Sequence, residues 1–152
     1  MDKHLVSLTS EEKSLLFNIP ALIAVLVAGA DGQMDQKELS WSEKIVHFRA
    51  NYKDSKLHDF YLEVEKYIHD SVEEYKNELP KEVSQREAAI NIELAKVNNI
   101  FGKIDKHFAE ELYHSFHTFA KQVARSSGGV VGYGAITPAE EKVLSLIAIK
   151  HP

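Results

Sequence analysis

Residues 26–39, LVAGADGQMDQKEL, contain the strongest indication of the fold. They join the small, apolar end of one helix to a reversal at Gly32 and then to a new helix start at Asp35. Glycine has the backbone freedom that a sharp reversal needs. Asp35 and Glu38, three residues apart, have the spacing of a capping box. The stretch therefore predicts two helices joined by a tight turn.

Helical periodicity extends from this turn in both directions. On the N-terminal side, a Thr9/Glu12 capping box predicts a helix from about Ser10 to Gly29, with a bend expected at Pro20. On the C-terminal side we expect a helix over residues 36–51, with an apolar stripe made of Trp41, Ile45, Phe48 and Tyr52. A further stripe, from Leu57 to Leu79, predicts a third helix that Pro80 ends.

The second half of the chain continues the helical pattern. Apolar stripes predict one helix from Ser84 to about Ile104, another after Asp105, and a last helix from Pro138 to about Lys150. No alternating β-branched run predicts a strand. With 152 residues, of which 44% are hydrophobic, the chain is long enough for one core. We therefore expect a single all-α domain over residues 1–152, a compact bundle of about six helices.

The sequence pattern of this turn occurs twice. Residues 133–140, YGAITPAE, match residues 31–38, DGQMDQKE, position by position. In each copy a Gly is followed two positions later by an apolar residue, Met34 or Ile136, and then by a helix cap with a Glu three residues on. This pattern indicates an internal duplication, in which two related helix-turn-helix units pack together.

In these stretches the chain resembles the TerB-like (tellurite-resistance protein B) domain family. The family signature is an alanine-rich helix, an Asp-Gly turn, an Asp-x-x-Glu helix start and a related element near the C-terminus. The resemblance spans nearly the whole chain and rests on residues 26–39, on VARSSGG at 123–129 and on ITPAEEKVLSLIA at 136–148. The second turn departs from the pattern, because it has Tyr133 and Thr137 where the first has Asp31 and Asp35.

The resemblance implies an adaptor domain of tellurite- or stress-resistance systems. It also implies a divalent cation at the acidic turns, and the residues that match are Asp31, Asp35, Glu38 and Glu140. An EF-hand alignment on Gly32 places the first three of these at ligand positions, but it leaves two other ligand positions to Val27 and Gly29. Because Asp35 and Glu38 also suit a helix cap, a cation site and a purely structural role both remain open.

The composition of the chain argues against several classes of function. A net charge of −5 provides no positive field for a phosphate backbone, so we expect no nucleic-acid partner. The absence of Cys excludes disulfides, thiolate zinc sites and thiol catalysis, and it is compatible with the cytoplasm, where we place the protein. The most apolar stretch, residues 15–30, is shorter than a bilayer requires, so we expect no membrane span.

Several polar residues have spacings found in active sites. Glu110, Glu111, His114 and His117 share i, i+3 and i+4 spacings, but most of this set lies opposite a phenylalanine stripe, so a solvated face is favoured. A hydrolase or oxidase using this face would need these histidines to converge with a carboxylate in a pocket. Two other pairs at i+4 spacing, Glu43/His47 and Glu65/His69, are expected to be surface pairs within one helix. No catalytic residue is identified.

The segment 126–134, SSGGVVGYG, is too rich in Gly to sustain a helix and lacks the Lys-Ser/Thr ending of a phosphate-binding loop. Its Val130, Val131 and Tyr133 are candidates for an apolar lip that docks a partner. We therefore expect a non-catalytic interaction domain with a protein partner and no certain cofactor. The alternative is a cation-responsive domain. The long stripe from Leu57 to Leu79 also makes a homodimer an expectation to test.

Overall fold

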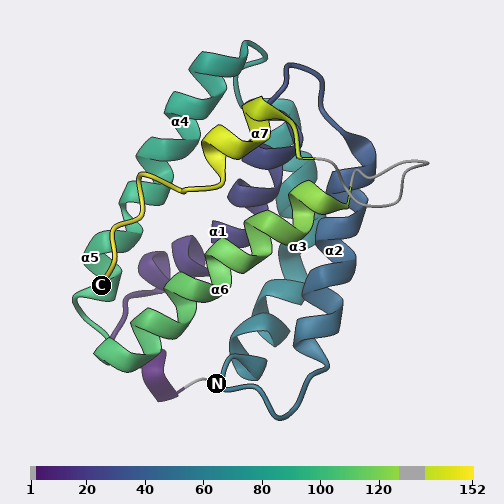
Figure 1. Ribbon diagram of the computed structural model, residues 1–152. Helices are drawn as coiled ribbons and strands as arrows, with labels where there is room; N and C mark the ends of the chain where they lie inside the picture. The colour runs from purple at the N-terminus through teal and green to yellow at the C-terminus, as the bar shows by residue number, and fades with distance from the viewer. Residues whose placement is uncertain (1–2, 127–135) are drawn as a thin grey trace.

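The computed structural model describes residues 3–126 and 136–152, and all regular structure within these ranges is helical (Figure 1). The prediction of an all-α bundle is confirmed. A short 3-10 helix, η1 (Lys3–Leu5), precedes the α-helices, which are α1 (Ser10–Ala28), α2 (Gln36–Ala50), α3 (His58–Glu78), α4 (Val83–Ala95), α5 (Val97–Phe101), α6 (Lys106–Arg125) and α7 (Pro138–Val143).

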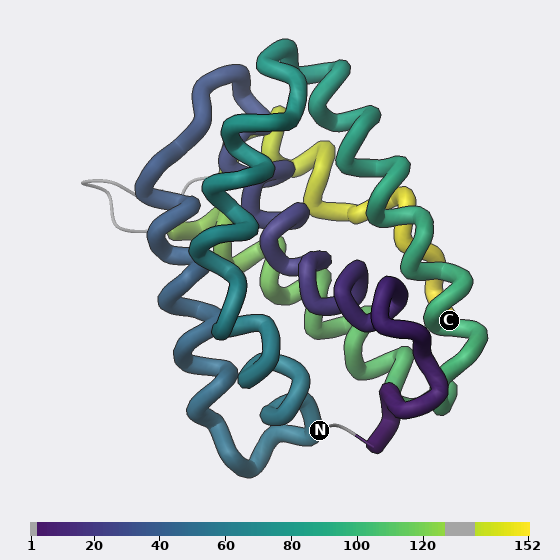
Figure 2. The backbone as a smooth tube through the Cα atoms, turned by 180° about the vertical axis from the view of Figure 1, so that it is seen from behind, coloured from purple at the N-terminus to yellow at the C-terminus, as the bar shows by residue number. Residues whose placement is uncertain are grey.

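Helix α1 is the centre of the bundle. Figures 1 and 2 show α2 and α3 on one side of it, α4 and α5 on the other, and α6 packed along it. Every residue from 19 to 30 is buried, as expected for a helix that is apolar on all sides. The helix continues through Pro20, which is itself buried. None of the helices in the described ranges combines the length and the apolarity needed to cross a bilayer.

Side-chain caps begin most helices where the sequence predicts them. The Thr9/Glu12 capping box of α1 is complete, with Thr9 Oγ1 accepting from the Glu12 amide at 3.1 Å and Glu12 Oε1 accepting from the Thr9 amide at 2.9 Å. Asp105 caps α6 by accepting from the Phe108 amide at 2.9 Å. These local signals fix the starts of helices independently of the rest of the fold.

Two helices differ from the prediction. The expected helix over 84–104 is divided into α4 and α5 at Lys96. The last helix ends at Val143 instead of about Lys150, and Leu146 adopts a left-handed φ of 47°. The chain after α7 is held by Asn98, which donates to Ala148 O and accepts from the Lys150 amide, both at 2.9 Å. These long-range bonds replace the helical bonds that the local sequence favours.

The apolar stripe predicted over residues 36–52 does not form the buried face of α2. Trp41, Phe48 and Tyr52 are exposed, at 41%, 71% and 54%, and Ile45 is half-buried. The buried face consists instead of Glu38, Leu39, Ser42, Val46 and Ala50. These mostly small residues let the helix axis approach its neighbours closely. The large aromatic side chains are left on the adjacent, unpacked face.

The long stripe of α3 is covered within the chain. Its central members Val64, Ile68 and Val72 are buried, and α3 packs against both α1 and α2. This stripe therefore gives no separate reason to expect a homodimer, and the homodimer stays a prediction.

Candidate functional site

The acidic turn between α1 and α2 is built around Gly32, whose φ of +97° is the left-handed conformation expected there. Asp31 is exposed. Asp35 Oδ1 accepts from the amides of Lys37 and Glu38, at 2.9 and 3.1 Å, and so caps α2. The Asp35 carboxylate therefore already has a structural use at the start of this helix.

The reciprocal half of this predicted capping box does not form. The Asp35 amide donates to Ala28 O, at 2.9 Å, and thereby ties the end of α1 to the start of α2. Glu38 is only 1% exposed. The Glu38 side chain is thus buried in the bundle and does not fold back onto the cap.

The second turn reproduces several features of the first. Thr137 and Glu140 form a complete capping box, with both bonds at 3.1 Å, and Glu140 is 3% exposed. Ile136 packs against the core as Met34 does. The starts of α2 and α7 therefore share a side-chain cap, an apolar residue before the cap and a buried glutamate. Tyr133, Gly134 and the candidate lip residues Val130 and Val131 lie outside the described residues.

The four candidate cation ligands have different surroundings. Asp31 is exposed, Asp35 and Glu140 are used in helix caps, and Glu38 is buried. Within residues 3–126 and 136–152, no group of three or more His, Asp or Glu side chains is arranged to hold a metal ion. A hard cation needs six to eight oxygen ligands.

This arrangement predicts that calcium and magnesium leave stability unchanged. At about 5 mM of either ion, we expect the melting temperature to move by less than about 1 °C, whereas a ligand at 100 times its Kd would add about 2.7 kcal/mol. Thermal unfolding followed by circular dichroism measures this. A saturable rise that the Asp31→Asn variant abolishes would instead establish a cation site at this turn.

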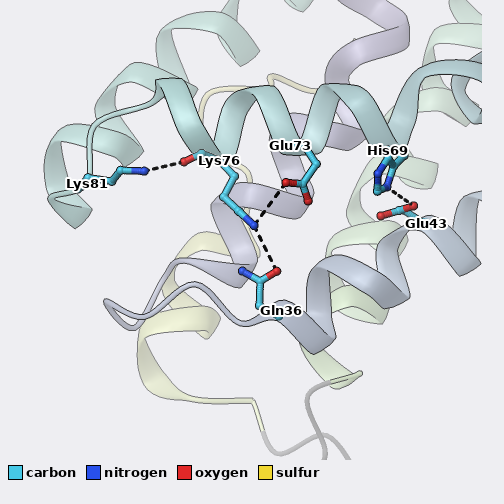
Figure 3. A network of polar contacts seen from close by, with 6 residues as sticks. All are labelled: Gln36, Glu43, His69, Glu73, Lys76 and Lys81. Carbon is cyan, nitrogen blue, oxygen red and sulfur yellow. Dashed lines mark hydrogen bonds and ion pairs between the residues drawn. The ribbon is translucent and has the colours of Figure 1, made fainter.

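A polar seam joins α2 to α3 (Figure 3). The histidine–glutamate pairs expected within each helix form across the seam instead: His69 Nδ1 lies 2.9 Å from Glu43 Oε1, and His47 pairs with Glu65. The intrahelical prediction is wrong because α2 and α3 lie side by side, which brings the carboxylate of the opposite helix within reach (Figures 1 and 2).

Further along the seam, Figure 3 shows Lys76 between Glu73 and Gln36. Its Nζ lies 3.5 Å from a carboxylate oxygen of Glu73 on the same helix and donates to Gln36 Oε1 across the seam, also at 3.5 Å. Lys81 donates to the Lys76 carbonyl at 3.0 Å. The seam is therefore polar along its length and helps to fix how α2 is placed against α3.

The Glu43 carboxylate raises the pKa of His69 above its ordinary value, first through their hydrogen bond and then through its charge. Because the folded-state pKa is the higher one, this pair stabilises the fold fully below the unfolded-state pKa. The stabilisation is lost as the pH rises through the folded-state pKa. We therefore expect His69→Gln to destabilise the protein at about pH 5.5 and to have no effect at about pH 9.

Urea unfolding of both proteins at each pH measures this difference. His114→Gln is the control, because the exposed His114 forms no ion pair with any described carboxylate. A His69→Gln effect of the same size at both pH values would contradict the expectation.

Arg86 is a buried cation that sequence reasoning missed. It is 6% exposed, and its guanidinium donates to Gly29 O at 2.6 Å, to Lys81 O at 2.9 Å and to Pro80 O at 3.4 Å. Gly29 is the C-cap of α1, so the positive charge lies at the negative end of the helix dipole. A Cβ on Gly29 would lie 2.6 Å from Arg86 Nη2, which explains a glycine there.

Arg49 ties α2 to α3 and α6. Its guanidinium donates to Tyr61 Oη at 2.7 Å, to the hydroxyl and carbonyl oxygens of Ser115 at 2.9 and 3.1 Å, to Thr118 Oγ1 at 3.1 Å and to Gln122 Oε1 at 2.8 Å. All these acceptors are neutral. The guanidinium is therefore fixed in place while its charge is not cancelled by a carboxylate.

The exposed aromatic residues of α2, together with Tyr52 just after its end, border two hollows. We call Trp41, Ile45, Phe48 and Tyr52 the aromatic strip. A groove of about 670 Å³ runs along it, and a smaller hollow of about 240 Å³ adjoins it, sharing Phe48, Arg49 and Tyr52. The Phe48 and Tyr52 rings stack nearly parallel, 7° apart, and Lys44 Nζ lies 4.6 Å above the Trp41 ring. Side chains of the strip therefore contact one another or a neighbouring lysine.

The histidine-rich face of α6 does not assemble the constellation that a hydrolase or oxidase would need. His114 and Glu111 line the smaller hollow, but His117 is not among the lining residues. The ring nitrogens of His117 lie 2.9 Å from Tyr113 O and 3.0 Å from Ser145 O instead. His117 therefore connects α6 to the segment after α7.

Comparison with family models, curated proteins and solved structures finds no match to this chain. The TerB-like resemblance therefore stays a prediction from the quoted residues.

Proposed function

We propose that this chain is a non-catalytic protein-interaction domain that binds its partner on the aromatic strip of α2. One observation carries the proposal: three large aromatic side chains, Trp41, Phe48 and Tyr52, are exposed together beside a groove. Single exposed apolar residues are ordinary, but a contiguous aromatic patch is characteristic of a binding surface.

The composition of the strip supports this role. Tryptophan, tyrosine and arginine are the residues enriched where binding energy concentrates, and Trp41, Tyr52 and Arg49 all line the groove. Arg49 is already held by its five neutral contacts, so little side-chain entropy would be lost when a partner binds.

For the wider role, we propose an adaptor of a cytoplasmic tellurite- or stress-resistance system. The support is the sequence resemblance, together with the Gly32 turn and the matched helix starts at Asp35 and Thr137. The alternative proposal is a divalent-cation-binding regulatory domain, and its support is the sequence resemblance at Asp31, Asp35, Glu38 and Glu140. The calcium and magnesium titration distinguishes the two.

Site-specific photocrosslinking in the cells that make the protein tests the docking surface. We expect a benzophenone amino acid at Phe48 to give a discrete covalent adduct. The same group at Tyr67 should give none, because Tyr67, another exposed aromatic at 56%, lies on α3 outside the groove. Adding Trp41→Ser and Tyr52→Ser should remove the Phe48 adduct.

The control variants must first show unchanged circular dichroism and unfolding. Equal crosslinking from both positions, or an adduct that survives the strip substitutions, would refute docking on the aromatic strip. Absence of any adduct at Phe48 would also count against it.

A further inference from the structure

The groove along the aromatic strip has a charge that differs from that of the whole chain. The chain carries a net charge of −5, yet the groove is lined by Lys44 and Arg49 and by no carboxylate. Across residues 3–126 and 136–152, no ion pair includes either of these two cations. The groove therefore joins apolar surface to uncancelled positive charge.

The dimensions of the strip match one helix. Trp41 and Phe48 lie seven residues apart on α2, which corresponds to about 10 Å or two turns, and Tyr52 follows two residues after the end of the helix. A partner helix can present apolar residues at i, i+3 or i+4, and i+7 over that length. Lys44, on the turn between Trp41 and Phe48, would then face one flank of the bound helix.

We infer that the partner segment is an amphipathic helix whose apolar face covers the aromatic strip and whose flanks carry Asp or Glu toward Lys44 and Arg49. This inference rests on the proposed docking function and names the chemistry of the partner. Opposite charges at the edge of an apolar contact select partners and speed association.

Two other occupants fit the charges less well. A second copy of the chain docked strip to strip would bring Lys44 and Arg49 toward their own counterparts, and like charges repel. An anionic bilayer is broad, so it would meet not only the groove but also the neighbouring seam carboxylates Glu43 and Glu65. A single helix is narrow enough to contact the groove alone.

Selection from a display library of random 16-residue peptides tests the inference with the full chain as bait. Trp41 is the only tryptophan, so its fluorescence reports binding at the strip directly. We expect the enriched peptides to have helical apolar periodicity with Asp or Glu on the flanks. They should shift the Trp41 emission to shorter wavelength, and they should lose binding to Phe48→Ser.

Charge reversal supplies the matched comparison. Lys44→Glu should weaken binding of the enriched peptides about tenfold. Lys106→Glu makes the same change in net charge outside the groove and should alter binding by less than about twofold. Equal losses in the two variants would overturn the charge assignment.

The outcomes separate this inference from the proposed function. Enriched peptides that are basic or non-helical, but that still need Phe48, would overturn the inference and leave the docking surface intact. Peptides that bind Phe48→Ser as well as the parent would overturn both. Binding to vesicles containing phosphatidylserine, or a dimer in light scattering that Phe48→Ser dissociates, would likewise replace the helix by another occupant.

Discussion

Phe116→Ala is expected to lower the free energy of unfolding by about 4 kcal/mol, because it removes a fully buried ring and leaves a cavity. Phe116 is 0% exposed on α6, and its ring centroid lies 6.0 Å from that of Phe60. Packing of this kind allows little relaxation into the space left behind. Urea unfolding at constant pH measures the loss.

The matched control is Phe48→Ala on α2. Phe48 is 71% exposed, so the same substitution there should change the free energy of unfolding by less than about 0.5 kcal/mol. A loss comparable to that of Phe116→Ala would mean that the aromatic strip belongs to the core, and it would remove the basis of the proposed docking surface. The expected pair of results would show that Phe116 stabilises the fold and that Phe48 does not, which leaves Phe48 available for binding.

Arg86→Met is expected to cost about 3 kcal/mol, since it keeps the aliphatic stem but deprives buried carbonyl oxygens of their donor. The Gly29 and Lys81 carbonyls would each lose a bond, at 2.6 and 2.9 Å. Arg125→Met, at an exposed position, is the control and should be nearly neutral.

A double-mutant cycle with Gly29→Ala tests whether the contact itself is responsible. A Cβ on Gly29 would meet Arg86 Nη2 at 2.6 Å, so Gly29→Ala should destabilise the parent protein. In the Arg86→Met background the same change should cost less, because the guanidinium is gone. Additive effects of the two substitutions would show that Gly29 and Arg86 act independently.

These substitutions distinguish the residues that stabilise the fold from the residues of the proposed docking surface. The buried part of α1, the Arg86 contact with its C-terminus and the polar seam between α2 and α3 hold the bundle together, while Trp41, Phe48 and Tyr52 stay exposed. An exposed aromatic surface carries a risk of nonspecific association, which binding of a partner would offset. This division is the physical basis for treating the strip as the functional part of the molecule.

The local sequence was sufficient for the helix starts. Thr9 with Glu12, Asp105, and Thr137 with Glu140 act through bonds within four residues, so spacing alone predicts them. The all-α class followed for the same reason, because helical periodicity is a local property of the chain.

Only the tertiary structure decided which faces are packed and which partners meet. An apolar stripe indicates that a helix has an apolar side, but burial depends on how closely a neighbour can approach. On α2 the small residues Ser42 and Ala50 let the neighbouring helices come close, so this face is packed and Trp41 and Phe48 are left exposed. Likewise, His69 found Glu43 across the seam instead of Glu65 in its own helix, because the distance between two helices is not encoded in the spacing along either one.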